Sequence, residues 1–271
     1  MTRFNKETVK LRSTPMDTSK KLQKQENNIC TDKEKTLYAS WVGALMWAAL
    51  CTRFDMAFAV AKLARYSSNP DDTHFEALDW LFGYIRKTIS HELMYEASGD
   101  QGECKLSAYS DAAFADDLDT MRSTGAFIIF LNDCPIAWRS KLQDNVTRST
   151  VEAEYVQLST TAVELVSYRR LHRGTAIVTI KDAGDREMSS FLYGDNQGSL
   201  AVATRQGGAS KTRHIAMHQH YVREAIENGD IRLSYVPTKE MLADLLTKAL
   251  GKSEHQRLCA LIGLRETQHR E

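Results

Sequence analysis

Four carboxylates in apolar surroundings constrain the fold of this 271-residue chain more than any other feature. Each of them lies beside a predicted sheet element: Asp111, Glu154, Asp195 and Asp244. A carboxylate near an apolar core is costly unless it is paired or binds a metal ion, and four that converge repel one another strongly unless cations lie between them. The order Asp, Glu, Asp, Asp in a strand-rich chain therefore predicts a two-metal phosphodiesterase site.

Each carboxylate also has an ordinary interpretation. Asp111 and Asp195 could cap a turn or a helix, and Asp244 could form a surface pair with the lysine four residues later. Glu154 is more informative, because at 100° per residue it lies roughly 60° from the centre of the apolar stripe of its predicted helix. Glu152 lies roughly 100° from that centre and is expected to face solvent. The four together, in this order, favour the metal site.

The second half of the chain has the pattern of an α/β domain with a mixed sheet. Strand and helix periodicities alternate there. We expect strands at 104–111, 126–131, 135–139, 189–193 and 231–236, and helices at 151–172, 213–227 and 239–249, with a further helix opening near Asp195. We take 103–250 as this domain and 251–271 as a C-terminal helix and tail.

A smaller helical unit is expected before that domain. Residues 1–35 carry nine Lys/Arg against five Asp/Glu, which predicts an extended basic lead-in. Helical spacing of apolar residues predicts helices at 36–67 and 73–89, so that 36–98 forms the helical unit. A composition break at 99–102 marks the boundary.

The charge balance excludes a global attraction to nucleic acid, since 35 Lys/Arg face 35 Asp/Glu. Any such binding must come from local groups, some of which could equally line solvated loops. The candidate contacts are Arg139, Lys141, Arg148, Ser149, Thr150, Asn196, Arg205, Lys211, Arg213 and His214.

The chain is expected to be soluble and intracellular. The five cysteines form no CxxC pair and are odd in number, which favours a reduced compartment. The apolar stretch 41–51 is about half the length of a membrane span.

Several sequence motifs resemble those of one family, the Ty1/copia-type retrotransposon Pol polyproteins. The motifs are YSDAAFA at 109–115, RSTGAFIIFL at 122–131, IAWRSKLQ at 136–143, STVEAEYVQLS at 149–159, GDNQGS at 194–199, SKTRHI at 210–215 and YVPTKEMLADLLTK at 235–248. They resemble the ribonuclease H domain of these polyproteins. The segment 40–88 resembles the stretch between the polymerase palm and that domain.

The resemblance implies a ribonuclease H-like mixed five-stranded sheet flanked by helices. It implies hydrolysis of the RNA strand of an RNA–DNA hybrid, with Asp111, Glu154, Asp195 and Asp244 as catalytic residues and ligands of two Mg²⁺ ions, or of Mn²⁺. Two such ions, roughly 3.5–4 Å apart, would generate the hydroxide and stabilise the leaving 3′ oxygen. The implied partners are the hybrid and the polymerase portion of a retroelement reverse transcriptase, with no membrane, in the cytoplasm (virus-like particle) or the nucleus.

The alternative is an inactive retroelement relic that keeps the fold and weak nucleic-acid binding. The palm's aspartates have no counterpart in the sequence, so we expect no reverse transcription from the chain by itself. Ala216 stands where the family usually has an aspartate. A related integrase is disfavoured, because its triad closes with a glutamate, whereas here the glutamate comes second.

Overall fold

In the computed structural model, five strands of the second half of the chain pair into one mixed sheet. They are β2 (Leu106–Ala113), β3 (Thr124–Leu131), β4 (Cys134–Leu142), β5 (Ser190–Gly194) and β6 (Ile231–Tyr235). The order across the sheet is β4-β3-β2-β5-β6. β2, β3 and β4 are antiparallel neighbours, whereas β5 runs parallel to both β2 and β6. The expected α/β fold with a mixed five-stranded sheet is therefore confirmed.

The structure describes residues 4–25, 27, 30–95, 105–175, 189–204 and 213–267, with side chains left undescribed at 173–175 and 213–219. The chain divides into two units, one of residues 1–94 with 248–271 and the other of residues 95–247.

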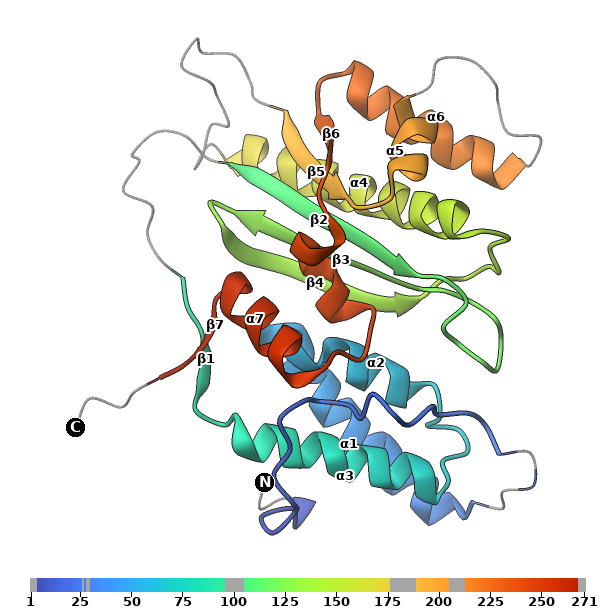
Figure 1. Ribbon diagram of the computed structural model, residues 1–271, viewed down its shortest axis with the longest axis vertical. Coiled ribbons are helices and arrows are strands. Elements are labelled where there is room, and N and C mark those ends of the chain that lie inside the picture. Colours follow the sequence, from blue (N-terminus) through green and yellow to red (C-terminus); the bar gives the residue numbers. More distant parts are fainter. Residues whose placement is uncertain are drawn as a thin grey trace. The chain divides into compact units, whose positions relative to one another are not determined.

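Three helices cover one face of the five-stranded sheet (Figure 1). They are α4 (Thr150–Thr175), α5 (Gln197–Thr204) and α6 (Arg213–Glu227). Side chains alternate between the two faces of a strand, so Leu106 and Ala108 of β2 enter the core with Leu158 and Leu165 of α4. The hairpin between β3 and β4 turns at Asn132 and Asp133, whose φ angles of 49° and 63° fit a type I′ turn, in which Asn and Asp are favoured.

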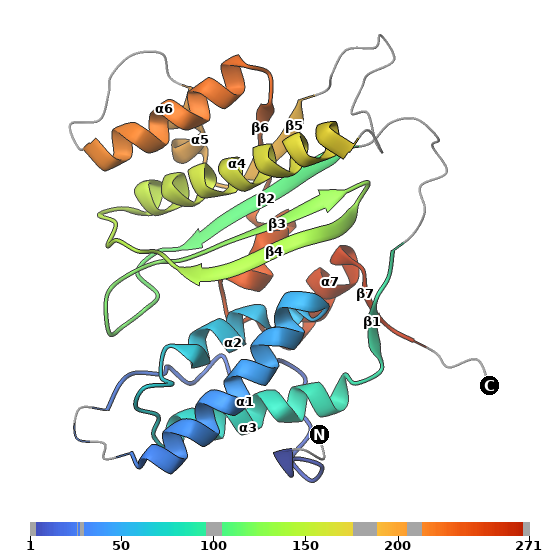
Figure 2. The same cartoon turned by 180° about the vertical axis from the view of Figure 1, so that it is seen from behind.

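The opposite face of the sheet carries the segment 236–247, as Figure 2 shows from behind. A helix at 239–249 was predicted there, and this prediction was wrong. The segment forms two short 3₁₀ helices, η3 (Thr238–Glu240) and η4 (Leu242–Leu246). Met241 between them is extended (φ −72°, ψ 101°) and buried against Val236, Ala243 and Tyr109. Burial of this side chain takes the backbone out of a continuous helix.

The first unit has α1 (Asp32–Cys51), η2 (Phe54–Met56), α2 (Ala57–Ala64) and α3 (Asp72–Lys87) in place of the predicted helices 36–67 and 73–89. The prediction of one continuous helix at 36–67 was wrong, because the backbone leaves the helical conformation at Arg53 (φ −111°, ψ 59°). Arg53 makes a two-pronged ion pair with the buried Asp55, at 2.9 and 2.8 Å, and the Tyr84 hydroxyl donates to the same carboxylate at 2.6 Å. Burial alone would raise the pKa of Asp55, but Arg53 and Tyr84 outweigh it and hold that pKa below its usual range.

The C-terminal segment belongs to the first unit. α7 (Lys252–Ile262) ends at Gly263, whose left-handed φ of 108° suits a helix C-cap. The next strand, β7 (Leu264–Glu266), pairs antiparallel with β1 (His91–Leu93). The tail 251–271, which we separated on sequence, is thus joined by hydrogen bonds to the end of the helical segment.

The lead-in lies along α3. The Trp80 indole donates to the Thr14 carbonyl at 2.9 Å, and Arg86 donates to the Val9 carbonyl at 2.8 Å. Gly83 allows the closest approach, because a Cβ built there would lie 2.1 Å from the carbonyl oxygen of Lys10. The lead-in at Lys10 therefore packs directly on α3, and any side chain at position 83 would block this contact.

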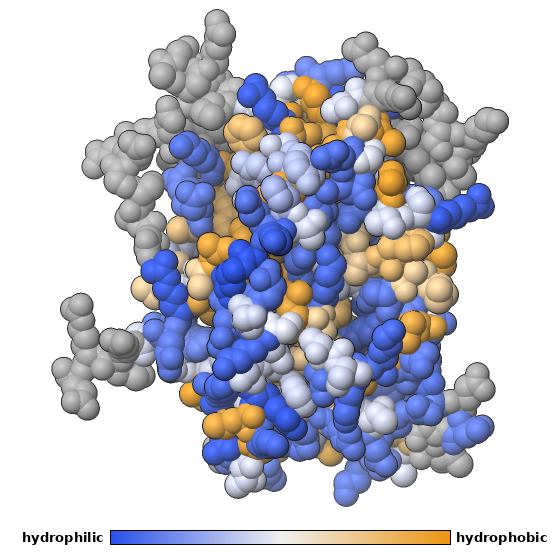
Figure 3. Space-filling model, in the orientation of Figure 1, coloured by the Kyte–Doolittle hydropathy of each residue, from blue (hydrophilic) through white to orange (hydrophobic). Residues whose placement is uncertain are grey.

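None of the described helices is long and apolar enough to cross a bilayer. The face in Figure 3 intersperses hydrophilic and apolar residues.

We predict that Gly83→Ala destabilises the first unit by about 1–3 kcal/mol, the usual range for overpacking. The added methyl must push the backbone at Lys10 away from α3. Gly43→Ala in α1 is the matched control, since nothing lies within 4 Å of its Cβ position, and it should stabilise by about 0.5–1 kcal/mol. Urea unfolding of the parent and both variants measures the free energies of unfolding. Equal stabilities of the two variants would contradict the close contact between Gly83 and the backbone of Lys10.

Candidate metal centre

Three of the four predicted carboxylates come together in the second unit. Each of Asp111, Glu154 and Asp195 offers an oxygen, and these oxygens all lie within 4.8 Å of one another. Asp111 and Glu154 are buried, with 1% and 7% of their surfaces exposed, whereas Asp195 is half-buried. The cluster is therefore closed on one side and accessible at Asp195.

Parallel pairing of β2 and β5 brings the two aspartates together. Tyr109 on β2 is the partner of Tyr193 on β5, and the two rings stack with centroids 4.8 Å apart. Two residues further along each strand, Asp111 and Asp195 reach the same level at the carboxyl end of the pair. Neighbouring parallel strands thus supply two carboxylates at one edge of the sheet.

The third carboxylate comes from the start of α4. The Ser149 hydroxyl accepts from the backbone N–H of Glu152 at 3.1 Å, and the Glu152 carboxylate accepts from the N–H of Arg148 at 2.9 Å. This reciprocal cap begins the helix at Thr150 and places Glu154 one turn further on. Glu154 is buried, as its position around the helix predicted. Glu152, which was expected to face solvent, is half-buried and is used in the cap.

Asp244 lies outside this three-carboxylate group. It belongs to η4, and its backbone carbonyl accepts from the N–H of Thr247 at 3.2 Å. The helix predicted at 239–249, on which Asp244 was expected to lie, is replaced by two short 3₁₀ helices. Its role as a fourth ligand stays a prediction.

Two threonine hydroxyls that the sequence did not single out reach the cluster. Thr247 donates through Oγ1 to Oδ2 of Asp111, and Thr238 donates through Oγ1 to Oδ2 of Asp195 at 2.7 Å. Both threonines come from the segment that follows β6. The only sequence signal for them is that they flank Asp244 in the motif YVPTKEMLADLLTK.

The donor set fits a hard divalent cation. All three ligands are carboxylates, and Mg²⁺ and Mn²⁺ prefer oxygen ligands. Three carboxylates held this close in a partly buried site repel one another, and a cation between them removes that repulsion. Asp111, Glu154 and Asp195 are the residues that would hold it.

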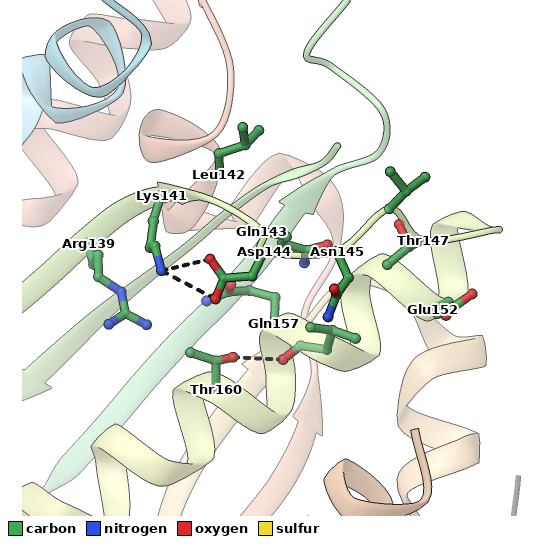
Figure 4. Close-up of a pocket in the computed structure, with 12 residues that line it drawn as sticks. Arg139, Lys141, Leu142, Gln143, Asp144, Asn145, Thr147, Glu152, Gln157 and Thr160 are labelled. Carbon is green, nitrogen blue, oxygen red and sulfur yellow. Dashed lines mark hydrogen bonds and ion pairs between the residues drawn. The ribbon is translucent and has the colours of Figure 1, made fainter. Parts of the chain in front are cut away.

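Two predicted phosphate contacts have carboxylate partners within the protein. The Arg139 guanidinium lies 3.1 Å from Glu164, and the Lys141 ammonium lies 3.1 Å from Asp144. Figure 4 shows Lys141 turned toward Asp144 at a cavity of about 140 Å³ between β4, α4 and the segment 143–147. A phosphate at either cation would compete with that carboxylate for the positive charge.

The remaining predicted contacts divide into three groups. Ser149 caps α4, and Asn196 accepts from the N–H of Ser199 at 2.9 Å near the start of α5. Arg148 and Thr150 are exposed beside the first of these caps. For Arg213 and His214 the structure describes only the backbone of α6, and Arg205 and Lys211 lie outside the described residues.

We predict that millimolar Mg²⁺ or Mn²⁺ raises the unfolding temperature of this protein and that Asp111→Asn abolishes most of the rise. The asparagine keeps the side-chain shape but removes one of the charges that a cation would neutralise. Glu227→Gln, an exposed position at the end of α6, is the control and should keep the parent's metal response. Thermal scans with chelator and with added metal give the comparison, and a metal response that survives Asp111→Asn would place the bound ion elsewhere.

No protein-family model matches the chain. It is 30% identical over 266 residues to the retrovirus-related Pol polyprotein from transposon TNT 1-94 of Nicotiana tabacum. The matched region covers 97% of this chain and 19% of that protein. It is 33% identical over 264 residues to the corresponding polyprotein from transposon RE2 of Arabidopsis thaliana, covering 97% and 17%. The chain thus spans less than a fifth of the length of these relatives. Ribonuclease H1 from the halophilic archaeon Halobacterium salinarum has 19% identity and a TM-score of 0.36, over 52% of this chain and 93% of that one.

Proposed function

This chain belongs to the Pol polyproteins of Ty1/copia-type retrotransposons, and from that premise we propose that its second unit is a Mg²⁺-dependent ribonuclease H. The substrate would be an RNA–DNA hybrid, and the reaction would be hydrolysis of its RNA strand. The observation that carries the proposal is the cluster of Asp111, Glu154 and Asp195 within 4.8 Å on the mixed sheet. Sheet topology, residue order and donor chemistry all agree with this function.

The three carboxylates differ in burial, and we assign their roles accordingly. Asp111 and Glu154 are buried and would anchor the cation side of the site, whereas the half-buried Asp195 borders the side from which a phosphate must approach. When bound, Mg²⁺ supplies the positive charge that makes water a better nucleophile and stabilises the leaving 3′ oxygen. Asp244, on η4 beside the Thr247 contact, is the candidate for a further ligand.

Substrate binding would depend on local positive charge, since the net charge of the chain is zero. Selection of the RNA strand would rest on its 2′-hydroxyls, which the wide minor groove displays. We place the reaction inside the cell, in the cytoplasm (virus-like particle) or the nucleus, beside the polymerase portion of the polyprotein.

We predict that the protein cleaves a labelled RNA–DNA hybrid when Mg²⁺ or Mn²⁺ is present and that Asp111→Asn lowers the rate by more than about a hundredfold. Loss of groups that merely orient metal ligands already costs about 10- to 100-fold, and Asp111 is itself a candidate ligand. Glu227→Gln should cleave like the parent. Equal cleavage by Asp111→Asn would assign the activity to a contaminant or to another site.

A parent protein that never cleaves the hybrid with either metal would favour the inactive relic. Ala216→Asp, which restores the aspartate usual in the family, would then be the next variant to assay.

We predict that the double change Arg148→Ala and Arg213→Ala flattens the dependence of log affinity on log salt by roughly 1.4 to 1.8 units. Each lost phosphate contact removes roughly 0.7 to 0.9 from that slope. Lys141→Ala should change the slope by less than about half a unit, because Asp144 already neutralises that ammonium. Binding titrations of the hybrid at several salt concentrations measure the slopes. An unchanged slope in the double variant would exclude both arginines as phosphate contacts.

A further inference from the structure

We propose that Thr247 and Thr238 are positioning residues that set the orientation of two of the three clustered carboxylates. The inference rests on the proposed function, since it concerns the same site. The proposed function assigns the carboxylates, whereas the two threonines are uncharged and come from the segment 236–247, outside the sheet. Metal binding tests their role without any cleavage assay.

Thr247 connects Asp111 to the turn that carries Asp244. Only 1% of Thr247 is exposed, and its hydroxyl donates to Oδ2 of Asp111. Its backbone N–H donates to the Asp244 carbonyl at 3.2 Å. A β-branched side chain has few χ1 rotamers, so the hydroxyl of Thr247 has little freedom to leave Asp111. One oxygen of the Asp111 carboxylate is thereby held in a fixed direction.

Thr238 acts in the same way on Asp195, but from an exposed position. Its hydroxyl donates to Oδ2 of Asp195 at 2.7 Å. The backbone nearby is held by a hydrogen bond of 3.0 Å from the N–H of Val236 to the carbonyl of Gly194. This hydrogen bond brings the segment after β6 beside the end of β5, and Asp195 is the residue that directly follows β5.

The segment that carries both hydroxyls is held on the sheet by its own apolar residues. Met241 and Ala243 have no exposed surface, and they pack with Val236 beside Tyr109 and Tyr193. Since Tyr109 and Tyr193 stand two residues before the two aspartates on their strands, the same packing fixes the hydroxyls relative to the carboxylates. A single segment therefore orients ligands from two different strands.

A hydroxyl is suited to this task because it carries no charge. A Lys or Arg at the same place would neutralise a carboxylate and compete with a cation, whereas a threonine donates one hydrogen bond and leaves the negative charge in place. The two threonines thus stabilise a cluster of like charges and preserve its affinity for metal.

The test compares valine and serine at each position in the full chain. Valine keeps the branched shape and removes the hydroxyl, while serine keeps the hydroxyl. We expect Thr247→Val to weaken Mn²⁺ binding by about 10- to 100-fold, the usual effect of losing a group that orients a metal ligand, and Thr247→Ser to restore most of the affinity. Thr238→Val should have a smaller effect, because water can replace an exposed hydroxyl. Calorimetric titration with Mn²⁺ measures the affinities, and thermal scans show that each variant is folded.

A structural role alone would lower the unfolding temperature without separating valine from serine in metal affinity. Mn²⁺ affinity in Thr247→Val equal to that of the parent, or equal loss in valine and serine, would overturn the inference, as would a parent that binds no Mn²⁺. If Thr247→Val does not fold, the exposed pair Thr238→Val and Thr238→Ser decides by the same criterion. Should the parent fail to cleave a hybrid while the valine and serine variants still differ in Mn²⁺ affinity, the proposed function fails and the positioning role stands.

Discussion

The mutual repulsion of three carboxylates is the constraint on which the second unit depends. Asp111, Glu154 and Asp195 hold oxygens within 4.8 Å of one another, two of them on buried side chains. Bringing like charges out of water and this close together opposes folding, so the surrounding structure must offset it. The parallel pair β2 and β5, the capped start of α4 and the hydroxyls of the segment 236–247 do so together.

These supports come from elements far apart in the sequence, and each acts by a different interaction. Strand pairing sets the level of the two aspartates, a helix cap sets the turn on which Glu154 lies, and neutral hydrogen bonds orient Asp111 and Asp195. The arrangement leaves the negative charge of the cluster available to a divalent cation, in agreement with a phosphodiesterase site.

The first unit shows the opposite solution to a buried charge. Asp55 has Arg53 as a direct counter-ion and Tyr84 as a hydrogen-bond donor, and its pKa is held low. A carboxylate satisfied in this way has little left to offer a metal ion. Removing one partner of such a buried pair typically costs about 3–5 kcal/mol, which assigns Asp55 to the stability of its own unit.

The sequence by itself determined the α/β pattern, the order of the strands along the chain, the hairpin at 132–133 and the burial of Glu154 over Glu152. These follow from local periodicity and turn chemistry, which act over a few residues. The tertiary structure alone decided that 239–249 is not a helix, that a helix breaks at Arg53, and that Thr238 and Thr247 meet the carboxylates. In each of these cases a side chain is buried against a partner distant in the sequence, or donates to one, and that interaction outweighs local helical preference.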